Sequence, residues 1–586
     1  MSEKGVWDML DVLFKLGWFF KQEKKRYIFA VILLLCANVT EIIPPWLIGK
    51  TIDFVNLKSL TEDKFKWILI VFAITLVLSY FINYLWRYLL FNGSQILESM
   101  MRKRIMAKFL TMSPSFYEKN RTGDLMAKAT NDLSAIRQTV GFGILTLVDS
   151  TTYMITIIAT MAIAISWKLT LAALIPLPFL AYIEQRLGKM IHERYTVSQD
   201  AFGDMNDSVL ESIEGVRVTR AFAQENQLDI HFKHMTTDVV NKFIHVEKLD
   251  ALFKPITIIV TSLSFMIGLG YGSYLVNQGE ISVGELIAFN VYLNMLVWPM
   301  FAIGLLFNIM QRGNASLDRV METLNTEDVM QDPIDTHVPK DHHVAFDAVT
   351  FKYPSSEEEN LKDISIEIKV GETLGIVGPT GSGKTTLIKQ ILKEYPMGHG
   401  NIKIGELSVK DLTKAEVRNK IGYVSQENIL FSRTVKENIQ FGKDDATDAE
   451  IDEAIRLANF TKDVERLPQG LATLVGEKGI AISGGQKQRI SIARAMIKNP
   501  DILILDDSLS AVDAKTETAI IENIRQSRHG KTTIISTHRL SAVQHADLIV
   551  VLDRGEIVER GTHEELIQQA GWYKSQFDRQ QLGGVS

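Results

Sequence analysis

Long uncharged runs occur only in the first half of this 586-residue chain. Between Tyr27 and Met310 they reach about 20 residues, the length needed to cross a bilayer. From about residue 340 onward, apolar residues come in short runs separated by polar turns, as in soluble α/β proteins. This pattern predicts an all-α membrane domain followed by an α/β domain. The six predicted spans are 27–48, 67–91, 138–166, 169–182, 255–276 and 284–310.

These runs also set the expected domain boundaries. Glu41 and the pair Pro44–Pro45 interrupt the first span, and only Trp167 and Lys168 separate the third span from the fourth, which predicts a hairpin. An amphipathic stretch at 6–20 suits an elbow helix in the membrane interface, with a soluble helix as the alternative. The predicted domains are an N-terminal segment at 1–26, a membrane domain at 27–320, a linker at 321–343 and an α/β domain at 344–586.

Basic residues flanking the spans predict the orientation. Lys21, Lys24, Lys25 and Arg26 precede the first span and place the N-terminus in the cytoplasm. The loops after spans two and four are also rich in Lys and Arg and read as helical, so the membrane helices are expected to continue into the cytoplasm. Each loop contains a glycine-bearing stretch that suits either a hairpin tip docking on another domain or an ordinary helix turn. These stretches are 121–125 leading to 130–132, and 214–217 leading to 221–222.

Composition excludes several other classes of protein. The net charge is −6 and no basic stretch dominates, so nucleic-acid binding is not expected. The single cysteine, Cys36, lies in an apolar run, which leaves no disulfide framework and no cysteine metal cluster. The first 26 residues carry several charges and no small-residue cleavage site, so no signal peptide is expected.

A glycine-rich segment after a short apolar strand carries the clearest chemical signal. Its pattern of two glycines followed by Lys and Thr is typical of a loop whose backbone amides surround a phosphate at the start of a helix. Lys384 would reach the β- and γ-phosphates, and the Thr385 hydroxyl would complete a magnesium shell. A structural turn is the alternative. The segment consists of Gly378, Pro379, Thr380, Gly381, Ser382, Gly383, Lys384, Thr385 and Thr386.

Further candidates follow strands or begin a helix. The strand at 502–506 ends in Asp506, a carboxylate suited to magnesium, and Asp507 comes next. His538 follows the strand at 533–536, at the end where ligands of open α/β sheets bind, and would contact a γ-phosphate, although a lone histidine is usually structural. Gln426 follows the strand at 422–425 and would sense magnesium or the attacking water.

Two candidates have nearly equal structural explanations. Tyr353, about 30 residues before Lys384, would stack on an adenine ring or simply pack at a strand end. The segment before the helix at 487–498 begins with Ser483, a good N-cap, and its glycines leave amides open to an anion. Alone it would be only a capped helix. Its residues are Ile482, Ser483, Gly484, Gly485 and Gln486.

Together these motifs closely resemble the nucleotide-binding domain of ATP-binding-cassette (ABC) transporters, joined to a six-helix exporter domain, over essentially the whole chain. The chain looks most similar to BmrC-like subunits of heterodimeric multidrug exporters from Gram-positive bacteria. The resemblance implies ATP and Mg²⁺ as cofactors and identifies the glycine-bearing loop stretches as coupling helices. It also assigns the Walker A loop to 378–385, the Q-loop to Gln426, the signature to 482–486, the Walker B strand to 502–506, the D-loop to Ser510 through Asp513 and the switch histidine to His538.

Two residues depart from the pattern of that family. Ile482 replaces the usual leucine, an apolar change that leaves the rest of the signature intact. Asp507 replaces the catalytic glutamate and is one methylene shorter. Positioned general-base catalysis contributes typically about 10²–10⁴-fold, and a withdrawal of about 1 Å can forfeit much of it. The resemblance therefore implies a heterodimer whose partner carries the glutamate. A homodimer in which aspartate suffices is the alternative.

The sequence thus predicts one half of an ATP-driven exporter of hydrophobic or cationic amphiphilic drugs. It would be a multi-pass protein of the inner (plasma) membrane, with its N-terminus and nucleotide-binding domain in the cytoplasm. Its expected partners are a second ABC half-transporter, the lipid bilayer and an amphiphilic substrate. Acids inside spans are costly and often functional, which makes Glu41 and Asp149 candidates for the substrate cavity, with hydrogen bonds to Asn38 or Asn290 as the alternative. A lipid or peptide exporter and a membrane-anchored sensor share these motifs, and an importer is disfavoured.

Overall fold

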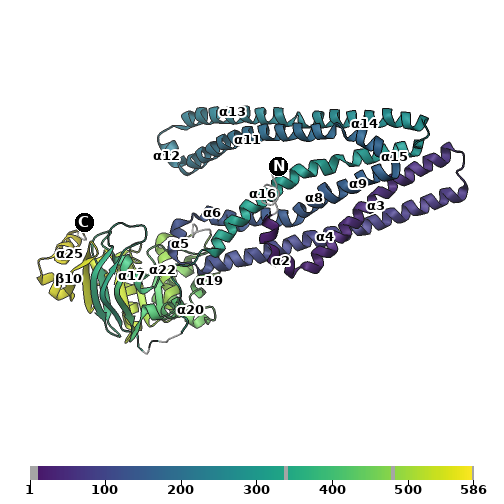
Figure 1. Ribbon diagram of the computed structural model, residues 1–586. Coiled ribbons are helices and arrows are strands. Elements are labelled where there is room, and N and C mark those ends of the chain that lie inside the picture. Colours follow the sequence, from purple (N-terminus) through teal and green to yellow (C-terminus); the bar gives the residue numbers. More distant parts are fainter. Residues whose placement is uncertain (1–10, 336–338, 340, 477–481, 584–586) are drawn as a thin grey trace. The chain divides into compact units, whose positions relative to one another are not determined.

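The computed structural model describes residues 11–335, 339, 341–476 and 482–583. The chain forms two compact units. One consists of Met1–Leu110 and Gly123–Thr326, and the other of Thr111–Thr122 and Glu327–Ser586. Figure 1 shows that the first is built of long helices and that the second contains the strands. We call them the membrane unit and the nucleotide unit.

Helices account for nearly all of the membrane unit that the structure describes. Residues 11–15 are helical as well, and residues 6–10 of the predicted amphipathic stretch lie outside the described residues. Four π-helical turns interrupt the helical segment Thr122–Leu174, namely η1 Lys128–Asp132 before the third span and η2 Thr139–Gly143, η3 Asp149–Tyr153 and η4 Met161–Ser166 within it. The α-helices are α2 Gly17–Gln22, α3 Lys24–Asn56, α4 Glu62–Thr111, α6 Thr122–Ala127, α7 Leu133–Gln138, α8 Ile144–Val148, α9 Met154–Thr160, α10 Trp167–Leu174, α11 Leu177–Glu214, α12 Val216–Ala221, α13 Glu225–Asp250, α14 Phe253–Asn277, α15 Val283–Met295 and α16 Val297–Asn325.

The spans differ in one respect from the six expected. Among the described residues, five helical segments are long and apolar enough to cross a membrane, and one of them, Thr122–Leu174, contains both the third span and the start of the fourth. Its direction changes at Ser166, whose backbone is extended and whose side chain caps α10. The predicted span 169–182 is not one continuous helix, because a turn at Ile175 and Pro176 separates α10 from α11. Pro176 has no amide hydrogen to continue the helix.

The first span is helical through its two prolines, since α3 continues through Pro44 and Pro45 to Asn56. Two consecutive prolines leave the carbonyls of Thr40 and Glu41 without helical amide donors. In a membrane helix, neighbouring helices can compensate for such a loss. Here the hydroxyl of Tyr292, on α15, donates a 2.7 Å hydrogen bond to the adjacent carbonyl of Ile42. The predicted extension of the helices beyond the bilayer is confirmed, since α4 alone has 50 residues.

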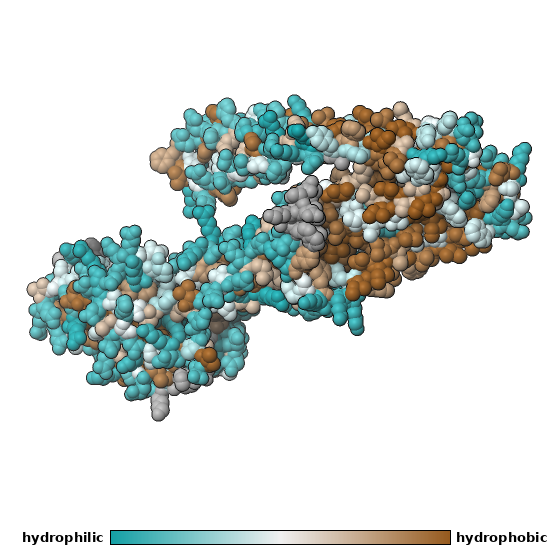
Figure 2. Space-filling model, viewed as in Figure 1, coloured by the Kyte–Doolittle hydropathy of each residue, from teal (hydrophilic) through white to brown (hydrophobic). Residues whose placement is uncertain are grey.

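Apolar side chains cover the outside of these helices. Figure 2 shows hydrophobic residues gathered over the region of α3, α4 and α14, whereas the surface of the nucleotide unit is mostly hydrophilic. Residues such as Ile70, Phe81 and Ile259 are more than half exposed. A soluble protein rarely leaves so large an apolar area in water, so this surface faces lipid.

Helices α3 and α15 approach each other closely at two glycines. A Cβ atom at Gly284 would lie 1.9 Å from the carbonyl oxygen of Gly49, and one at Gly49 would lie 2.7 Å from that of Gly284. The Asp53 carboxylate caps α15 by accepting bonds from the Gly284 amide at 2.8 Å and the Ser282 hydroxyl at 2.7 Å. Small residues allow helices in membranes to pack at such short distances. The two glycines and Asp53 therefore lock the outer ends of these spans together.

Replacement of Gly284 by alanine is expected to destabilise the membrane unit by about 1–3 kcal/mol, because the new methyl group overlaps the backbone of α3. The loss would appear as a lower apparent Tm of the purified chain in detergent. Gly270→Ala is the matched control, since a Cβ at Gly270 would meet no atom within 4 Å. Equal melting temperatures for the two variants would contradict the close contact.

The nucleotide unit contains two sheets. A four-stranded sheet has the order β2-β1-β4-β5, and a six-stranded sheet has the order β10-β9-β3-β8-β7-β6. In the larger sheet β9, β3, β8, β7 and β6 are parallel, and only β10 is antiparallel. The strands are β1 Val344–Phe351, β2 Leu361–Ile368, β3 Thr373–Val377, β4 His399–Ile404, β5 Leu407–Ser408, β6 Ile421–Val424, β7 Ile502–Asp506, β8 Thr532–Ser536, β9 Leu548–Asp553 and β10 Glu556–Gly561.

Helices cover these sheets and bury continuous apolar strands. All five residues of β7 and of β8 are buried, as expected for strands covered on both faces. The helices of eight residues or more are α17 Lys384–Ile391, α20 Asp448–Leu457, α22 Gly484–Met496, α23 Ala514–Ser527 and α25 Trp572–Gly583. Shorter helices are α18 Lys414–Lys420, α19 Val435–Gln440, α21 Thr461–Arg466 and α24 His563–Gln568.

A short helix from the first cytoplasmic loop, α5 Pro114–Lys119, belongs to the nucleotide unit. The Ser113 amide donates a 3.2 Å bond to Asp328, and the Tyr395 hydroxyl bonds to Glu118. Asp328 also pairs with Lys414 at 2.6 Å. Burial alone would raise the pKa of Asp328, but the bonds from Lys414 and Ser113 outweigh it and hold that pKa below its usual value.

The docked helix lies just before the stretch predicted from the sequence. Residues 121–125 begin where the docked segment ends and continue into α6 of the membrane unit. Extended backbone at Ser113 and Asn120 on either side of α5 turns the chain into and out of it. In the second loop, the predicted turn glycine Gly215 does join α11 to α12.

Candidate nucleotide-binding site and membrane recess

The predicted phosphate loop connects β3 to α17 and has the backbone that only glycines adopt easily. Gly378, Gly381 and Gly383 have φ angles of +149°, +82° and +104°. A Cβ atom at Gly378 would lie 2.1 Å from the Leu552 carbonyl oxygen, so any side chain there would clash with β9. The loop therefore presents backbone amides at the start of α17, where the helix dipole favours an anion.

The lysine of this loop is folded back over it. The Lys384 ammonium donates to the carbonyls of Gly378 at 2.9 Å and Pro379 at 2.8 Å. Burial lowers its pKa, which the nearby carboxylates of Asp507 and Asp506 partly oppose. A phosphate oxygen in the loop would offer this ammonium a charged partner in place of two carbonyls.

Asp506 and Thr385 form a pair suited to magnesium. The Thr385 hydroxyl donates a 3.2 Å bond to Oδ1 of Asp506, while Oδ2 has no partner among the described residues. Asp506 is only 1% exposed, and burial raises its pKa. A buried carboxylate oxygen without a donor fits a cation, because Mg²⁺ prefers oxygen ligands. Two of the three residues that the sequence selected for the metal thus meet, whereas the third, Gln426, is exposed past the end of β6.

The backbone of Asp507 is left-handed, with φ of +45°. Its amide donates a 2.8 Å bond to the Ser536 carbonyl of β8, and the Ser510 hydroxyl bonds to its carbonyl. Aspartate tolerates this backbone better than most residues. His538 follows the end of β8 and is half-buried. The parallel sheet thus brings the ends of β3, β6, β7 and β8 to one edge, as the sequence predicted.

Tyr353 lies beside the start of α17 and packs on other aromatic rings. Its hydroxyl donates a 3.2 Å bond to Thr386. Its ring makes edge contacts with Phe351 and Tyr395, with centroids 4.9 Å away in both cases. The ring is half-buried, so the packing role proposed as the alternative is present and leaves part of the ring accessible.

The predicted signature caps α22 through a reciprocal pair. The Ser483 hydroxyl accepts from the Gln486 amide, and the Gln486 side chain accepts from the Ser483 amide. Gly484 and Ser483 are exposed, so the first turn of a 13-residue helix is open to an anion. Asp513 in the predicted D-loop similarly caps α23, and its hydrogen bonds with Thr516 lower its pKa.

Two residues that the sequence analysis missed hold the loops of this site. Arg539 donates to the carbonyls of Ser510 and Val512, and so ties the residue after His538 to the D-loop. The Gln580 side chain donates to the His538 carbonyl at 2.8 Å and accepts from the Leu540 amide at 3.0 Å. The adjacency of Arg539 to His538 was a usable signal. Gln580 had none, because its partners lie about 40 residues away.

The two predicted membrane carboxylates line the same recess of the membrane unit, with a volume of about 400 Å³. Asp149 is 8% exposed and accepts a 2.9 Å bond from the Trp298 indole. The hydrogen bond expected as the alternative role is therefore present, but its donor is neither Asn38 nor Asn290. The Glu41 carboxylate lies beside the Tyr153 hydroxyl.

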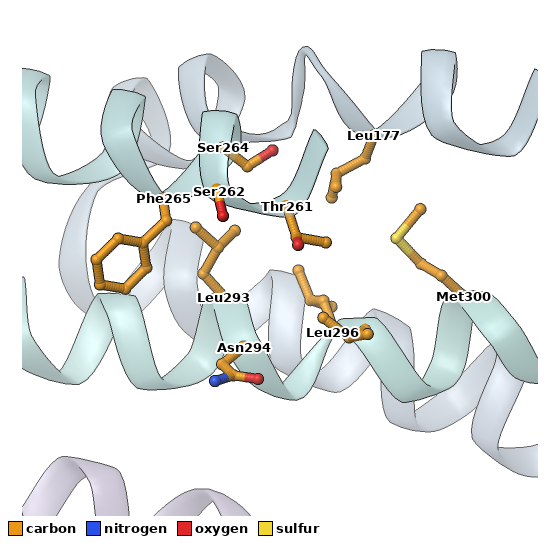
Figure 3. A pocket seen from close by; sticks show the side chains of 10 residues that line it. Leu177, Thr261, Ser262, Ser264, Phe265, Leu293, Asn294, Leu296 and Met300 are labelled. Atoms are coloured by element: carbon orange, nitrogen blue, oxygen red, sulfur yellow. The ribbon is translucent and has the colours of Figure 1, made fainter. Parts of the chain in front are cut away.

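A smaller, uncharged cavity of about 180 Å³ lies between α14 and the α15–α16 junction. Figure 3 shows Thr261 and Ser262 above it, with Leu293 and Met300 among the apolar side chains around it. Asn294 lines both this cavity and the larger recess. The membrane unit therefore has an uncharged cavity of mixed polar and apolar lining next to a charged recess.

Comparison with known proteins decides the family. Residues 27–300 match the ABC transporter transmembrane region, and residues 361–510 match the ABC transporter domain. The chain is 55% identical over 577 residues to the probable multidrug resistance ABC transporter ATP-binding/permease protein YheI of Bacillus subtilis (strain 168), covering 98% of each. It belongs to the ABC transporter family.

Other relatives agree with this assignment. The multidrug resistance-like ATP-binding protein MdlA of Escherichia coli (strain K12) is 39% identical over 97% of this chain and 96% of its own length. A solved structure of a bacterial Atm1-family ABC exporter with ATP bound superposes with a TM-score of 0.78, at 25% identity, covering 95% of this chain and 98% of that one. The chain thus has the ABC exporter fold, couples ATP hydrolysis to transport and is a multi-pass protein of the inner membrane. The BmrC-like subfamily stays a prediction.

Proposed function

We infer that this ABC exporter expels hydrophobic or cationic amphiphilic drugs by alternating access. The observation that carries this proposal is the recess containing Glu41 and Asp149, two carboxylates inside the membrane unit. Acids at this depth are costly unless they serve a ligand or an ion. The names of YheI and MdlA, which refer to multidrug resistance, support the same substrate class.

The site residues would divide the work on ATP as follows. The loop amides and Lys384 bind the phosphates, and Tyr353 stacks on the adenine. Thr385 and Asp506, with Gln426, would hold Mg²⁺, which when bound supplies charge neutralisation for the phosphates. His538 contacts the γ-phosphate. The signature residues 482–486 and the D-loop would serve the site of a second chain, because Ser483 and Gly484 leave the start of α22 exposed.

We further propose a heterodimer with unequal sites. Asp507 is a methylene shorter than the glutamate of the family and would activate the attacking water poorly, while the intact Ser483 cap would complete the partner's site. The partner would then carry the glutamate. The alternative, a homodimer in which Asp507 suffices, predicts full ATP turnover by this chain alone.

Closure of the nucleotide units would reach the membrane through the cytoplasmic loops. The bonds from Ser113 and Tyr395 that place α5 in the nucleotide unit support this role for the first loop. In the second loop, Val218 of α12 and Phe222 just after it are exposed and form an apolar tip suited to docking on another nucleotide unit.

ATP-dependent transport into membrane vesicles tests the proposed function. Inverted vesicles containing the full-length chain and its partner are mixed with an external fluorescent cation, with and without ATP. Accumulation that requires ATP and stops in a Lys384→Ala variant is the expected result. ATP hydrolysis without any movement of the cation would instead favour a lipid or peptide exporter or a sensor.

Tyr353→Ala is expected to raise the Kd for ATP by about 5- to 150-fold, since stacking of a base on an aromatic ring contributes about 1–3 kcal/mol. Tyr353→Phe keeps the ring and loses only the bond to Thr386, so it should bind nearly as tightly as the parent. Fluorescent ATP-analogue titration of the purified chain provides the measurement. Equal weakening by both changes would assign Tyr353 to packing instead.

A further inference from the structure

One buried side chain in the membrane recess has an unused hydrogen-bond donor. Asn38, on α3, is 6% exposed and lines the recess, and its amide nitrogen has no acceptor among the described residues. A buried amide without a partner costs about 1–3 kcal/mol, so such a group usually awaits a ligand or water. Asn38 lies one helical turn before Glu41, which places both side chains on one face of α3.

The charges around this amide are unbalanced. Glu41 and Asp149 both line the recess. The one basic residue in the lining, Arg87, stacks over Trp86 at 5.3 Å and forms no ion pair within the described chain. Two carboxylates against one guanidinium leave one negative charge in excess. With both carboxyl groups ionised, a single positive charge would neutralise the recess, and a dication or an anion would not.

The geometry also fits an amphiphile. The Trp298 indole satisfies one oxygen of Asp149, which leaves the other available to a cation. Aromatic rings of Trp86, Tyr153 and Trp298 border the site, and such faces attract cationic groups. A volume of about 400 Å³ lies within the range of drug-sized pockets.

We propose that the recess of Asn38, Glu41 and Asp149 binds amphiphilic monocations that carry a hydrogen-bond acceptor about one helical turn from the positive charge. The carboxylates hold the cation, and the Asn38 amide donates to the acceptor. This selectivity rests on the proposed efflux function for its physiological role, but binding itself requires neither ATP nor the partner's catalytic site.

Fluorescence anisotropy of rhodamine 6G, a monocation with an ester carbonyl, tests the binding on the full-length purified chain without ATP. Tetraphenylphosphonium, a monocation without an acceptor, is the comparison ligand and is measured by displacement. Asn38→Leu keeps the shape of the side chain and should weaken rhodamine 6G by about 2- to 10-fold, with no change for tetraphenylphosphonium. Glu41→Gln and Asp149→Asn should weaken both ligands by about tenfold or more.

Matched controls lie outside the recess. Asn290→Leu changes another buried asparagine, and Glu184→Gln changes a carboxylate of a different cavity. Both should leave binding of either cation unchanged. The proposal would be overturned if Asn38→Leu left rhodamine 6G binding intact or weakened both ligands equally. It would also be overturned if the control variants weakened binding, or if the parent chain bound neither cation.

The same variants in vesicles separate this inference from the proposed function. If the recess variants weaken binding but the parent protein moves no cation with ATP, the proposed efflux function is wrong and the binding site is supported. If ATP-driven transport is unchanged in all three recess variants, the efflux function is supported and the recess is not its binding site.

Discussion

Replacing Asp507 by glutamate is expected to raise the steady-state magnesium-ATPase turnover of this chain, purified alone, by about 10²-fold or more. The added methylene extends the carboxylate toward the attacking water, and a well-placed general base contributes about 10²–10⁴-fold. The sheet supports this geometry, because Asp507 follows Asp506 directly at the end of β7 and its amide is held by Ser536. The parent should turn over slowly.

The left-handed backbone at this position adds a second expectation. Glutamate tolerates a φ of +45° less well than aspartate, so Asp507→Glu should lower the stability of the chain by about 1 kcal/mol while it raises turnover. Asp507→Asn is the control and should abolish the residual activity. Robust turnover of the parent alone would contradict the unequal-site proposal and indicate a self-sufficient homodimer.

Asp506→Asn is expected to reduce magnesium-dependent ATP hydrolysis at this site of the assembled exporter to the background rate. Binding of fluorescent ATP, measured without magnesium, should stay nearly unchanged. The reason is that Oδ2 of Asp506 is the buried, unpaired oxygen that would meet the cation. A neutral amide offers a much weaker ligand to a hard cation. Single-turnover hydrolysis in an Asp507→Glu background makes the loss measurable.

The same substitution should stabilise the ligand-free chain. Burial raises the pKa of Asp506, so the ionised form of its carboxyl group is disfavoured in the folded state. The protonated carboxyl group contributes stability at low pH, and this contribution is lost as the pH rises above the pKa that Asp506 has in the unfolded chain. At neutral pH asparagine removes that penalty. Asp501→Asn, at the other end of β7, is the matched control and should destabilise instead, because Asp501 pairs with Lys420 and His342. Thermal unfolding without magnesium distinguishes the two, and a lower Tm for Asp506→Asn would contradict this account.

Most of the nucleotide site could be predicted from the sequence because its residues follow strands directly. Lys384, Asp506 and His538 each lie within a few residues of a strand end, and parallel strands place those ends at one edge. The order of the strands could not be predicted in this way, and β8 lies between β3 and β7. The placement of α5 in the nucleotide unit could not be predicted for a related reason, since Ser113 and Glu118 bond to Asp328 and Tyr395, which lie more than 200 residues away in the sequence.

Features that depend on a local pattern could be predicted from the sequence alone, namely the apolar spans, the glycine loop, the strand-end acids and the shortened side chain at Asp507. Features that depend on partners far along the chain required the three-dimensional structure. It carried α3 through Pro44 and Pro45 beside Tyr292, paired Asp149 with Trp298 and left Asn38 without an acceptor. Such pairings are set by how helices pack side by side, and helix periodicity alone does not say which faces meet.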